Sequence, residues 1–367
     1  MPTICIMTTS HFPKDDRIFH KEALFLKNQG YDVIIIAQHD DDAVIDGIRI
    51  IPLHIAKRRL DRYVINVFHA LWLAFQVRAD AYHFHDPELL FAGFIMKLAG
   101  KVVIYDVHED YQQKLLSKHF SGKRLAAGIW RIVESTLSRF FNHVFTADSH
   151  TKQHFPPHKT TVLANYPPLR FTDVVRHRKE DGVFRIVYAG GIDCSRGIAK
   201  TIDALELLSD IPVEFHVAGP PPDGPLMDRM SQHSKVVYHG LLPWEEVNSL
   251  LAECDLGVVL LQPVPAYLYC PGENIIKLFE YMGVGLPVLI SNFPRLKHLI
   301  ESIDAGKAVE PTSPEKIATA IKELRHNPAL LRRMGENGRR AVLEKYNWEH
   351  EGNKMLAVYS QLTGMDQ

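Results

Sequence analysis

Short apolar runs alternate with segments of helical periodicity along nearly the whole chain. Strand-like apolar runs occupy residues 3–9, 32–37, 81–85, 101–107, 143–147, 184–190, 213–219, 235–240, 255–261 and 287–291. Between them, segments such as 17–30, 197–210 and 243–255 space their apolar residues three and four apart, as amphipathic helices do. Uniformly apolar strands that alternate with helices are typical of parallel sheets covered on both faces, so the pattern predicts an α/β fold.

The alternation breaks once, at residues 165–182, which begin Pro-rich, continue charged and follow neither period. This break separates two α/β blocks of similar size, and we place an interdomain linker there. Ligands of doubly wound sheets bind outside the carboxyl ends of the strands, so motifs that follow strands are considered first for function.

Composition narrows the functional classes. The chain has 367 residues, 46% of them hydrophobic and 23% charged, and its net charge of -1 gives no argument for a nucleic-acid partner. Its four cysteines share no ligand spacing, which indicates a reducing compartment without a disulfide framework. The N-terminus lacks a signal-peptide pattern, and the longest apolar run (64–75) is too short to span a bilayer. We therefore expect a cytoplasmic protein, with peripheral membrane contact left open.

Histidines and acids follow two strands of the first block: His83, His85, Asp86, Asp106, His108 and Glu109. Histidine and carboxylate suit a transition metal, which is one interpretation. A second makes Asp86 a helix cap and His83 a buried, hydrogen-bonded side chain. The third, which we prefer, makes His108 a polar group that positions a substrate.

Two further strand ends carry basic residues. Gly190 and Gly191 end a strand, and Arg196 lies where a helix begins. This combination suits the binding of a phosphate group. A plain tight turn without a ligand is an equal alternative. The loop after the first strand leads into a helix that begins near Asp15 or Asp16 and carries Arg17. For that helix a solvated charged face is the alternative.

Residues 112–141 combine six basic residues with a single acid and interleaved apolar side chains. Basic amphipathic helices bind anionic membrane surfaces, but a charged outer helix packed on its own sheet is the favoured alternative.

Residues 273–294 contain a helix with two faces. Leu278, Phe279 and Met282 form an apolar stripe, whereas Lys277 and Glu280 lie on the charged face. A Gly at 285 before a Pro at 287 predicts where this helix ends.

Taken together, these segments resemble the family 4 retaining glycosyltransferases of the GT-B fold. The resemblance rests on "HFPKDDRIFHKEALFLKNQGYDVIIIA", "HDPELL", "VVIYDVHE", "GGIDCSRGI", "HGLLPWEEV", "KLFEYMGVGLPVLISN" and "YNWEHEGNKMLAVYSQL", in that order. It implies two doubly wound Rossmann-like domains facing across a cleft. The first is residues 1–167, an acceptor-side domain completed by a terminal helix at about 350–367, and the second is residues 168–349, which bind the nucleotide-sugar.

The resemblance also implies roles for individual residues. Glu280 would bind the donor ribose, Arg196 the diphosphate, and His108 the donor sugar near its reacting carbon. Lys277 would be a second phosphate contact or the partner of Glu280. Phosphate would be held by the backbone N–H groups at the expected start of the helix, those of Gly272, Glu273 and Asn274. The predicted substrate-binding set also includes Gly190, Gly191, Arg17 and Asp86.

Two positions depart from the family pattern. The first glutamate of the E-x7-E motif would fall on Gly272, and Glu273 is one residue late. Gly191 stands where the family often has a basic residue. Both departures concern the identity of the donor.

The reaction implied is transfer of a sugar, with retention, from a nucleotide-diphosphate sugar to a saccharide or lipid-linked acceptor, with UDP the favoured nucleotide. A fixed cation and helix N-terminal amides would stabilise the leaving diphosphate, so no metal and no other cofactor are expected. Two alternatives remain: a GT-B nucleotide-sugar 2-epimerase, or a non-catalytic GT-B subunit of a polysaccharide-assembly complex.

Overall fold

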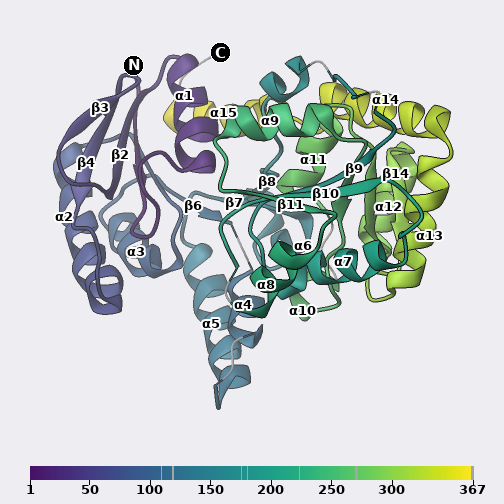
Figure 1. The fold of residues 1–367 in the computed structure, drawn as a ribbon. Coiled ribbons are helices and arrows are strands. Elements are labelled where there is room, and N and C mark those ends of the chain that lie inside the picture. Colours follow the sequence, from purple (N-terminus) through teal and green to yellow (C-terminus); the bar gives the residue numbers. More distant parts are fainter. Residues whose placement is uncertain are drawn as a thin grey trace. The chain divides into compact units, whose positions relative to one another are not determined.

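The computed structural model divides the chain into two compact units, one of residues 1–165 and 348–367 and one of residues 166–347 (Figure 1). The boundaries expected from the sequence were 167/168 and 349/350. The structure describes residues 1–108, 110–117, 120–174, 176–179, 181–222, 224–268 and 272–364. Three residues considered in the sequence analysis lie outside these ranges: Glu109, Lys118, which is one of the six basic residues of 112–141, and Cys270, which is one of the four cysteines.

The first unit is built on an eight-stranded sheet with the order β3-β4-β2-β1-β5-β6-β7-β8. All neighbouring strands pair in parallel except β3 with β4. The strands are β1 (Thr3–Met7), β2 (Asp32–Gln38), β3 (Ala43–Ile45), β4 (Ile48–Leu53), β5 (Ala81–Phe84), β6 (Val103–Val107), β7 (His143–Thr146) and β8 (Thr160–Val162).

Helices of the first unit connect these strands and pack on the sheet. In chain order they are η1 (Asp16–Ala23), α1 (Leu24–Asn28), η2 (Asp61–Ile65), α2 (Asn66–Val77), η3 (Pro87–Leu89), α3 (Leu90–Leu98), α4 (Tyr111–Ser117), α5 (Lys123–Ser138), α6 (Ser149–Lys152), η4 (Pro157–Lys159) and α15 (Trp348–Thr363). The first of them begins where the sequence predicts, because the Asp15 side chain accepts hydrogen bonds from the backbone N–H groups of Arg17 and Ile18.

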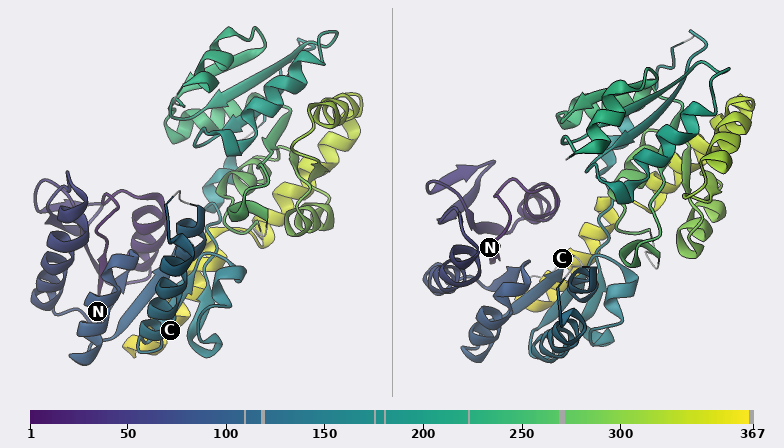
Figure 2. Two further views of the ribbon diagram at one scale, coloured as in Figure 1. Left: turned by 90° about the horizontal axis from the view of Figure 1, so that it is seen from below. Right: turned by 60° about the horizontal axis from the view of Figure 1, so that its bottom comes forward.

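The C-terminal helix α15 belongs to the first unit although the whole second unit precedes it in the chain. Trp348 Nε1 donates to the carbonyl of Lys21 over 2.9 Å, and Gly352 lies so close to Phe25 that a Cβ there would meet the ring at 2.6 Å. Figure 2 shows this yellow helix beside the blue elements of the first unit. The terminal helix that the family resemblance implied is thus present and docked.

The second unit is built on a six-stranded, fully parallel sheet with the order β11-β10-β9-β12-β13-β14. Its strands are β9 (Phe184–Ala189), β10 (Val213–Ala218), β11 (Val236–Gly240), β12 (Leu256–Val259), β13 (Val288–Ser291) and β14 (Gly306–Val309). Its helices are η5 (Leu169–Asp173), η6 (Cys194–Arg196), α7 (Ile198–Glu206), α8 (Pro225–Gln232), α9 (Trp244–Glu253), α10 (Pro265–Leu268), α11 (Ile276–Gly283), α12 (Pro294–Ile303), α13 (Pro314–Arg325) and α14 (Pro328–Glu344).

The two Rossmann-like α/β units predicted from the periodicity are confirmed, and each of the ten strand-like runs contains a strand. Each sheet has its own buried apolar core, formed by strand residues and by the inner faces of the helices. Among the residues that the structure describes, no helix is long and apolar enough to cross a bilayer.

Candidate functional site

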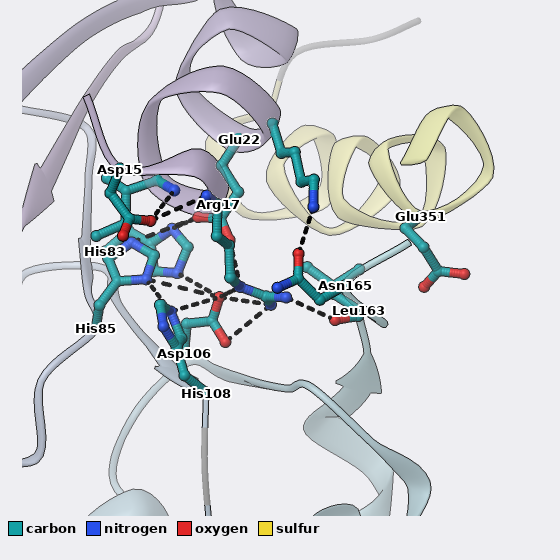
Figure 3. A network of polar contacts seen from close by, with 12 residues as sticks. Asp15, Arg17, Glu22, His83, His85, Asp106, His108, Leu163, Asn165 and Glu351 are labelled. Carbon is teal, nitrogen blue, oxygen red and sulfur yellow. Dashed lines mark hydrogen bonds and ion pairs between the residues drawn. The ribbon is translucent and has the colours of Figure 1, made fainter. Parts of the chain in front are cut away.

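A buried ionic network lies at the carboxyl ends of β5 and β6 in the first unit, and Arg17 is its centre (Figure 3). The guanidinium donates to both oxygens of Asp106 over 2.8–3.1 Å and to the carbonyl of Leu163 over 2.9 Å. Only 4% of Arg17 is exposed, and Lys21, one turn later, is 1% exposed and donates to Asn165 Oδ1 over 2.6 Å. The alternative of a solvated charged face is therefore wrong for both residues.

Two carboxyl groups compete for this guanidinium. Arg17 Nε lies 2.9 Å from Glu22 Oε1 and 3.0 Å from Asp106 Oδ2, and its single N–H donates to Asp106. Burial raises the pKa of Glu22 well above its usual range, and the neighbouring charge of Asp106 raises it further. Burial also acts to raise the pKa of Asp106, but Arg17 outweighs it and holds that pKa well below its usual range. The network therefore carries an ionised Asp106 and a protonated Glu22.

Three histidines extend the network toward the surface. His83 and His85 lie on the same face with ring centroids 4.4 Å apart, and His85 Nδ1 is 2.7 Å from His108 Nε2. Burial lowers the pKa of His83 to about 3 and that of His85 well below its usual range, so both rings are neutral. His83 is hydrogen-bonded to the Tyr359 hydroxyl over 2.8 Å, in line with the interpretation of a buried structural histidine. His108 is the most exposed of the three histidines, with 19% of its side chain accessible to solvent.

Asp86 organises the loop that follows β1. Its carboxylate accepts hydrogen bonds from the Thr8 hydroxyl over 2.6 Å, the Thr9 backbone N–H over 2.7 Å, and Ser10. Its side chain makes no cap bond to η3, so the helix-cap interpretation is wrong for the carboxylate; only its backbone carbonyl accepts from Leu89. Asp86 thus fixes the backbone of the loop.

The metal interpretation of this cluster can be judged from its geometry. Ligand atoms of Glu22, His85, Asp106 and His108 all lie within 4.8 Å of one another. A fixed cation already lies there, because the Arg17 guanidinium contacts both carboxyl groups. A divalent ion would face that guanidinium at short range, so we interpret the cluster as an internally neutralised network rather than a metal centre.

A second cluster surrounds the carboxyl end of β9 in the other unit. Lys277 Nζ donates to the Tyr188 hydroxyl over 2.7 Å and lies 4.2 Å from the centre of that ring. Gly190 has a φ of +133°, and a Cβ there would meet Lys277 Nζ at 2.7 Å. Glycine at this position therefore lets the lysine reach the end of the strand.

The charges of this cluster act on one another. Burial and the neighbouring charge of Arg196 together lower the pKa of Lys277 to about 7, although Glu280 and Asp193 oppose the shift. Arg196 lies 5.1 Å from the centre of the Tyr267 ring, and its Nε is 3.2 Å from Asp193 Oδ2. The structure thus brings the predicted residues Gly190, Arg196, Lys277 and Glu280 into one electrostatic neighbourhood, which also contains Asp193.

One detail of the prediction is wrong. The helix was expected to begin at residues 272–274, but it begins at Ile276. Residues 272–274 form a turn, which is closed by a hydrogen bond of 3.0 Å from the Ile275 N–H to the Gly272 carbonyl. Glu273 is therefore in a loop, whereas Glu280 is in the helix. On the glycine-rich side, α7 begins at Ile198, directly after the short helix η6 that contains Arg196.

Sequence reasoning did not single out Glu22 or Tyr188. Glu22 interrupts the buried face of the first helix, between Ile18 and Phe19 on one side and Ala23 on the other, and an acid in an apolar stripe is a usable signal. Tyr188 lies within an apolar strand, where nothing in the pattern distinguishes it from a core residue.

Comparison with known proteins agrees with this architecture. Residues 170–341 match the protein-family model "Glycosyl transferases group 1". Among curated relatives, an uncharacterized glycosyltransferase of Methanocaldococcus jannaschii is 24% identical over 49% of this chain, and the D-inositol 3-phosphate glycosyltransferase of Rhodococcus opacus is 26% identical over 55%. The matches span 45% and 41% of those two proteins, so the chain covers less than half of each.

Solved structures match along the whole chain. The sucrose-phosphate synthase of Thermosynechococcus elongatus superposes with a TM-score of 0.77 at 16% identity, covering 100% of both chains. HepE of Anabaena, in complex with UDP and glucose, gives 0.73 at 16% identity and covers 98% of this chain and 100% of HepE. The protein therefore has the fold of the GT-B glycosyltransferases, and residues 170–341, most of its second unit, are similar to the glycosyl transferases group 1 model.

Proposed function

We propose that this protein is a glycosyltransferase that moves a sugar from a nucleotide-diphosphate sugar to a saccharide or lipid-linked acceptor. The observation that carries the proposal is the cluster of Lys277, Arg196 and Glu280 around the glycine turn after β9. This cluster lies within the residues that match the glycosyl transferases group 1 model. UDP is the favoured nucleotide, which the UDP bound in the HepE structure supports.

Each residue of the cluster has a part in the proposed reaction. Cleavage of the sugar–phosphate bond develops negative charge on the diphosphate, and Arg196 together with the protonated form of Lys277 stabilises it. Glu280 binds the ribose hydroxyls through charge-assisted hydrogen bonds. Gly191, Gly272 and Asn274 supply backbone near the phosphates, and Glu273 is assigned to the donor side. With two cations present, departure of the diphosphate needs no metal ion.

The first unit supplies the acceptor side in this proposal. His108 contacts the donor sugar, and Arg17 and Asp86 hold the elements around it in place through their buried contacts. Transfer proceeds with retention: the acceptor hydroxyl attacks the face from which the diphosphate leaves, and the leaving phosphate accepts the hydroxyl proton. No protein side chain is assigned as the base.

We further propose that the enzyme works at the cytoplasmic face of a membrane through α5. This helix exposes 70% of Leu125, 54% of Ile129 and 67% of Ile132, beside the basic residues Lys123 and Arg124. Apolar side chains flanked by basic ones suit an anionic lipid surface. Flotation with liposomes that contain anionic lipid should be lost when Lys123 and Arg124 are both changed to Glu; flotation that survives this reversal would refute the contact.

The transferase assignment is tested with a panel of UDP-, GDP- and ADP-sugars. A donor should raise the melting temperature of the protein, because a ligand that binds only the folded state stabilises it. Nucleoside diphosphate should then be released when acceptor lipid is added. Rapid epimerisation of a UDP-sugar without any acceptor would instead identify the protein as an epimerase.

A further inference from the structure

A cavity of about 470 Å³ lies in the second unit, at the amino ends of the strands. Asp255, which directly precedes β12, and Gly285, which lies between α11 and β13, both line it. One face of α14 completes the lining, with Arg332, Glu336 and Arg339 at helical spacing. The cluster after β9 lies at the carboxyl ends of these parallel strands, so the cavity is at the opposite edge of the sheet.

Two glycines bring the walls of this cavity together. A Cβ at Gly335 would meet the carbonyl oxygen of Gly285 at 2.2 Å, so α14 packs directly on the backbone that follows α11. Gly285 has a φ of +75°, which favours glycine. The Cδ atoms of Arg176 and Arg339 lie 3.8 Å and 4.0 Å from the point where a Cβ of Gly285 would be. The two arginine side chains therefore converge on the same part of the wall.

Positive charge exceeds negative charge in the lining, which contains four arginines and two acids; we call it the arginine cavity. Arg178 Nε lies 2.7 Å from Asp255 Oδ1, so these two side chains neutralise each other. The other lining acid is Glu336. The three remaining arginines therefore leave an excess of two positive charges. They are Arg176, Arg332 and Arg339.

Two of these arginines are held in place by neutral partners. Arg176 donates through Nη1 to the carbonyl of Gly285 over 3.0 Å and through Nη2 to that of Cys254. Arg339 donates through Nη2 to the carbonyl of Thr172 over 2.6 Å. A guanidinium has five N–H donors, and in the part of the chain that the structure describes Arg176 Nε is buried without a hydrogen-bond partner. Burial lowers the pKa of Arg176, so a nearby anion would stabilise its charge.

A phosphate monoester matches the charge and the size of the cavity. Guanidinium groups bind phosphate oxygens through paired hydrogen bonds, and a phosphate monoester carries a charge of about -1.5 to -2 at pH 7. The volume falls within the range of about 300–1,000 Å³ that small-molecule sites occupy, which leaves room for an organic body beside the phosphate. Val284, Pro328 and Leu331 supply an apolar wall for that body.

We propose that the arginine cavity binds a small phosphate monoester, whose phosphate is held by Arg176, Arg332 and Arg339. The bound ester would link residues 176–178 to the end of α11 and to α14. This site is separate from the residues assigned to the donor diphosphate, and it does not depend on the transferase reaction.

The test is isothermal titration calorimetry of the full chain at low salt, with glycerol 3-phosphate as the ligand and glycerol as the neutral control. The wild type should bind glycerol 3-phosphate and not glycerol. Arg176→Gln and Arg332→Glu should each weaken binding at least tenfold, since each removes charge-assisted hydrogen bonds to the phosphate. Arg333→Ala is the matched control and should leave the Kd unchanged, because Arg333 is on the same helix but pairs with Asp304 over 2.9 Å outside the lining.

Two further variants keep the proposal falsifiable. Glu336→Gln removes a negative charge from the lining and should tighten binding severalfold, which loss of structure would not do. Arg196→Ala removes a cation of the cluster after β9 and should leave the Kd unchanged. The proposal is overturned if the wild type does not bind glycerol 3-phosphate or binds glycerol equally well. It is also overturned if the Arg176→Gln/Arg332→Glu double variant binds as tightly as the wild type, or if Arg196→Ala abolishes binding. Circular dichroism verifies that the variants fold.

Discussion

The pKa of Lys277 gives a prediction that separates an anion site from an ordinary buried lysine. Burial and Arg196 lower this pKa from 10.5 to about 7. The shift corresponds to roughly 5 kcal/mol by which the charged form is disfavoured, as an upper bound for a half-buried side chain. A diphosphate beside Lys277 would restore the charged form, so donor binding should be coupled to uptake of a proton.

The size of this coupling follows from the two pKa values. If bound donor returns the pKa of Lys277 to its ordinary value, binding takes up about 0.9 proton at pH 8 and about 0.1 proton at pH 6. Because the protonated lysine binds better, donor affinity should fall about tenfold between pH 6 and pH 8. The sugar-nucleotide diester does not titrate in this range, so the effect reports on the protein.

Calorimetry with UDP-glucose in buffers of different ionisation enthalpy measures the proton uptake. Lys277→Arg keeps the charge at every pH and should abolish both the uptake and the pH dependence. Lys200→Arg is the matched control, since Lys200 is partly exposed and paired with Asp203 over 3.3 Å, and it should behave as the wild type. Tight binding at pH 8 with no proton uptake would refute the assignment of Lys277 to the diphosphate.

Three further predictions address the other clusters. Glu280→Ala should weaken donor binding by about 1.5–3 kcal/mol in calorimetry while the melting temperature stays the same, and an unchanged Kd would exclude the ribose contact. Arg17→Ala should lower the free energy of unfolding by about 3–5 kcal/mol in urea denaturation, because it leaves the Asp106 carboxylate buried and unpaired. Arg49→Ala removes an exposed ion pair and should lower it by less than about 1 kcal/mol. Equal losses for the two variants would contradict the buried network. The pKa of His83 is about 3 in the folded protein and near 6.5 in the unfolded chain, so its contribution to stability is present above pH 6.5 and is lost as the pH falls, by up to about 1.4 kcal/mol per pH unit. His83→Gln should remove this part of the pH dependence of the unfolding free energy between pH 6.5 and 4.5. An unchanged pH dependence would show that the ring is not buried in its neutral form.

Periodicity predicted the central strands because their burial leaves a clear mark in the sequence. Four strands were missed: β3 and β8 at the edges of the first sheet, β14 at one edge of the second, and β4 beside β3, although Asp46 and Gly47 between β3 and β4 are a good hairpin signal. Both residues have positive φ, 48° and 73°, as that tight turn requires. Edge strands are short and half-covered, so the turn residues were the better evidence there.

The candidate site was predicted unevenly for a physical reason. Motif spacing indicated Arg196, Lys277 and Glu280, because local sequence decides where a turn ends and which face of a helix is polar. It did not show that Arg17 would be buried against Asp106, since that pair is separated by 89 positions and forms only in the folded sheet.

The most direct test of the account is to follow the anomeric proton of each sugar nucleotide in a UDP-, GDP- and ADP-sugar panel by ¹H NMR, with acceptor lipid present. The account predicts that one donor loses its sugar, that the product keeps the anomeric configuration of the donor, and that Arg196→Ala slows the release strongly while the fold is retained. If no sugar nucleotide binds or reacts, or if release is unaffected by Arg196→Ala, the assignment of this protein as a glycosyltransferase with its diphosphate site after β9 is wrong.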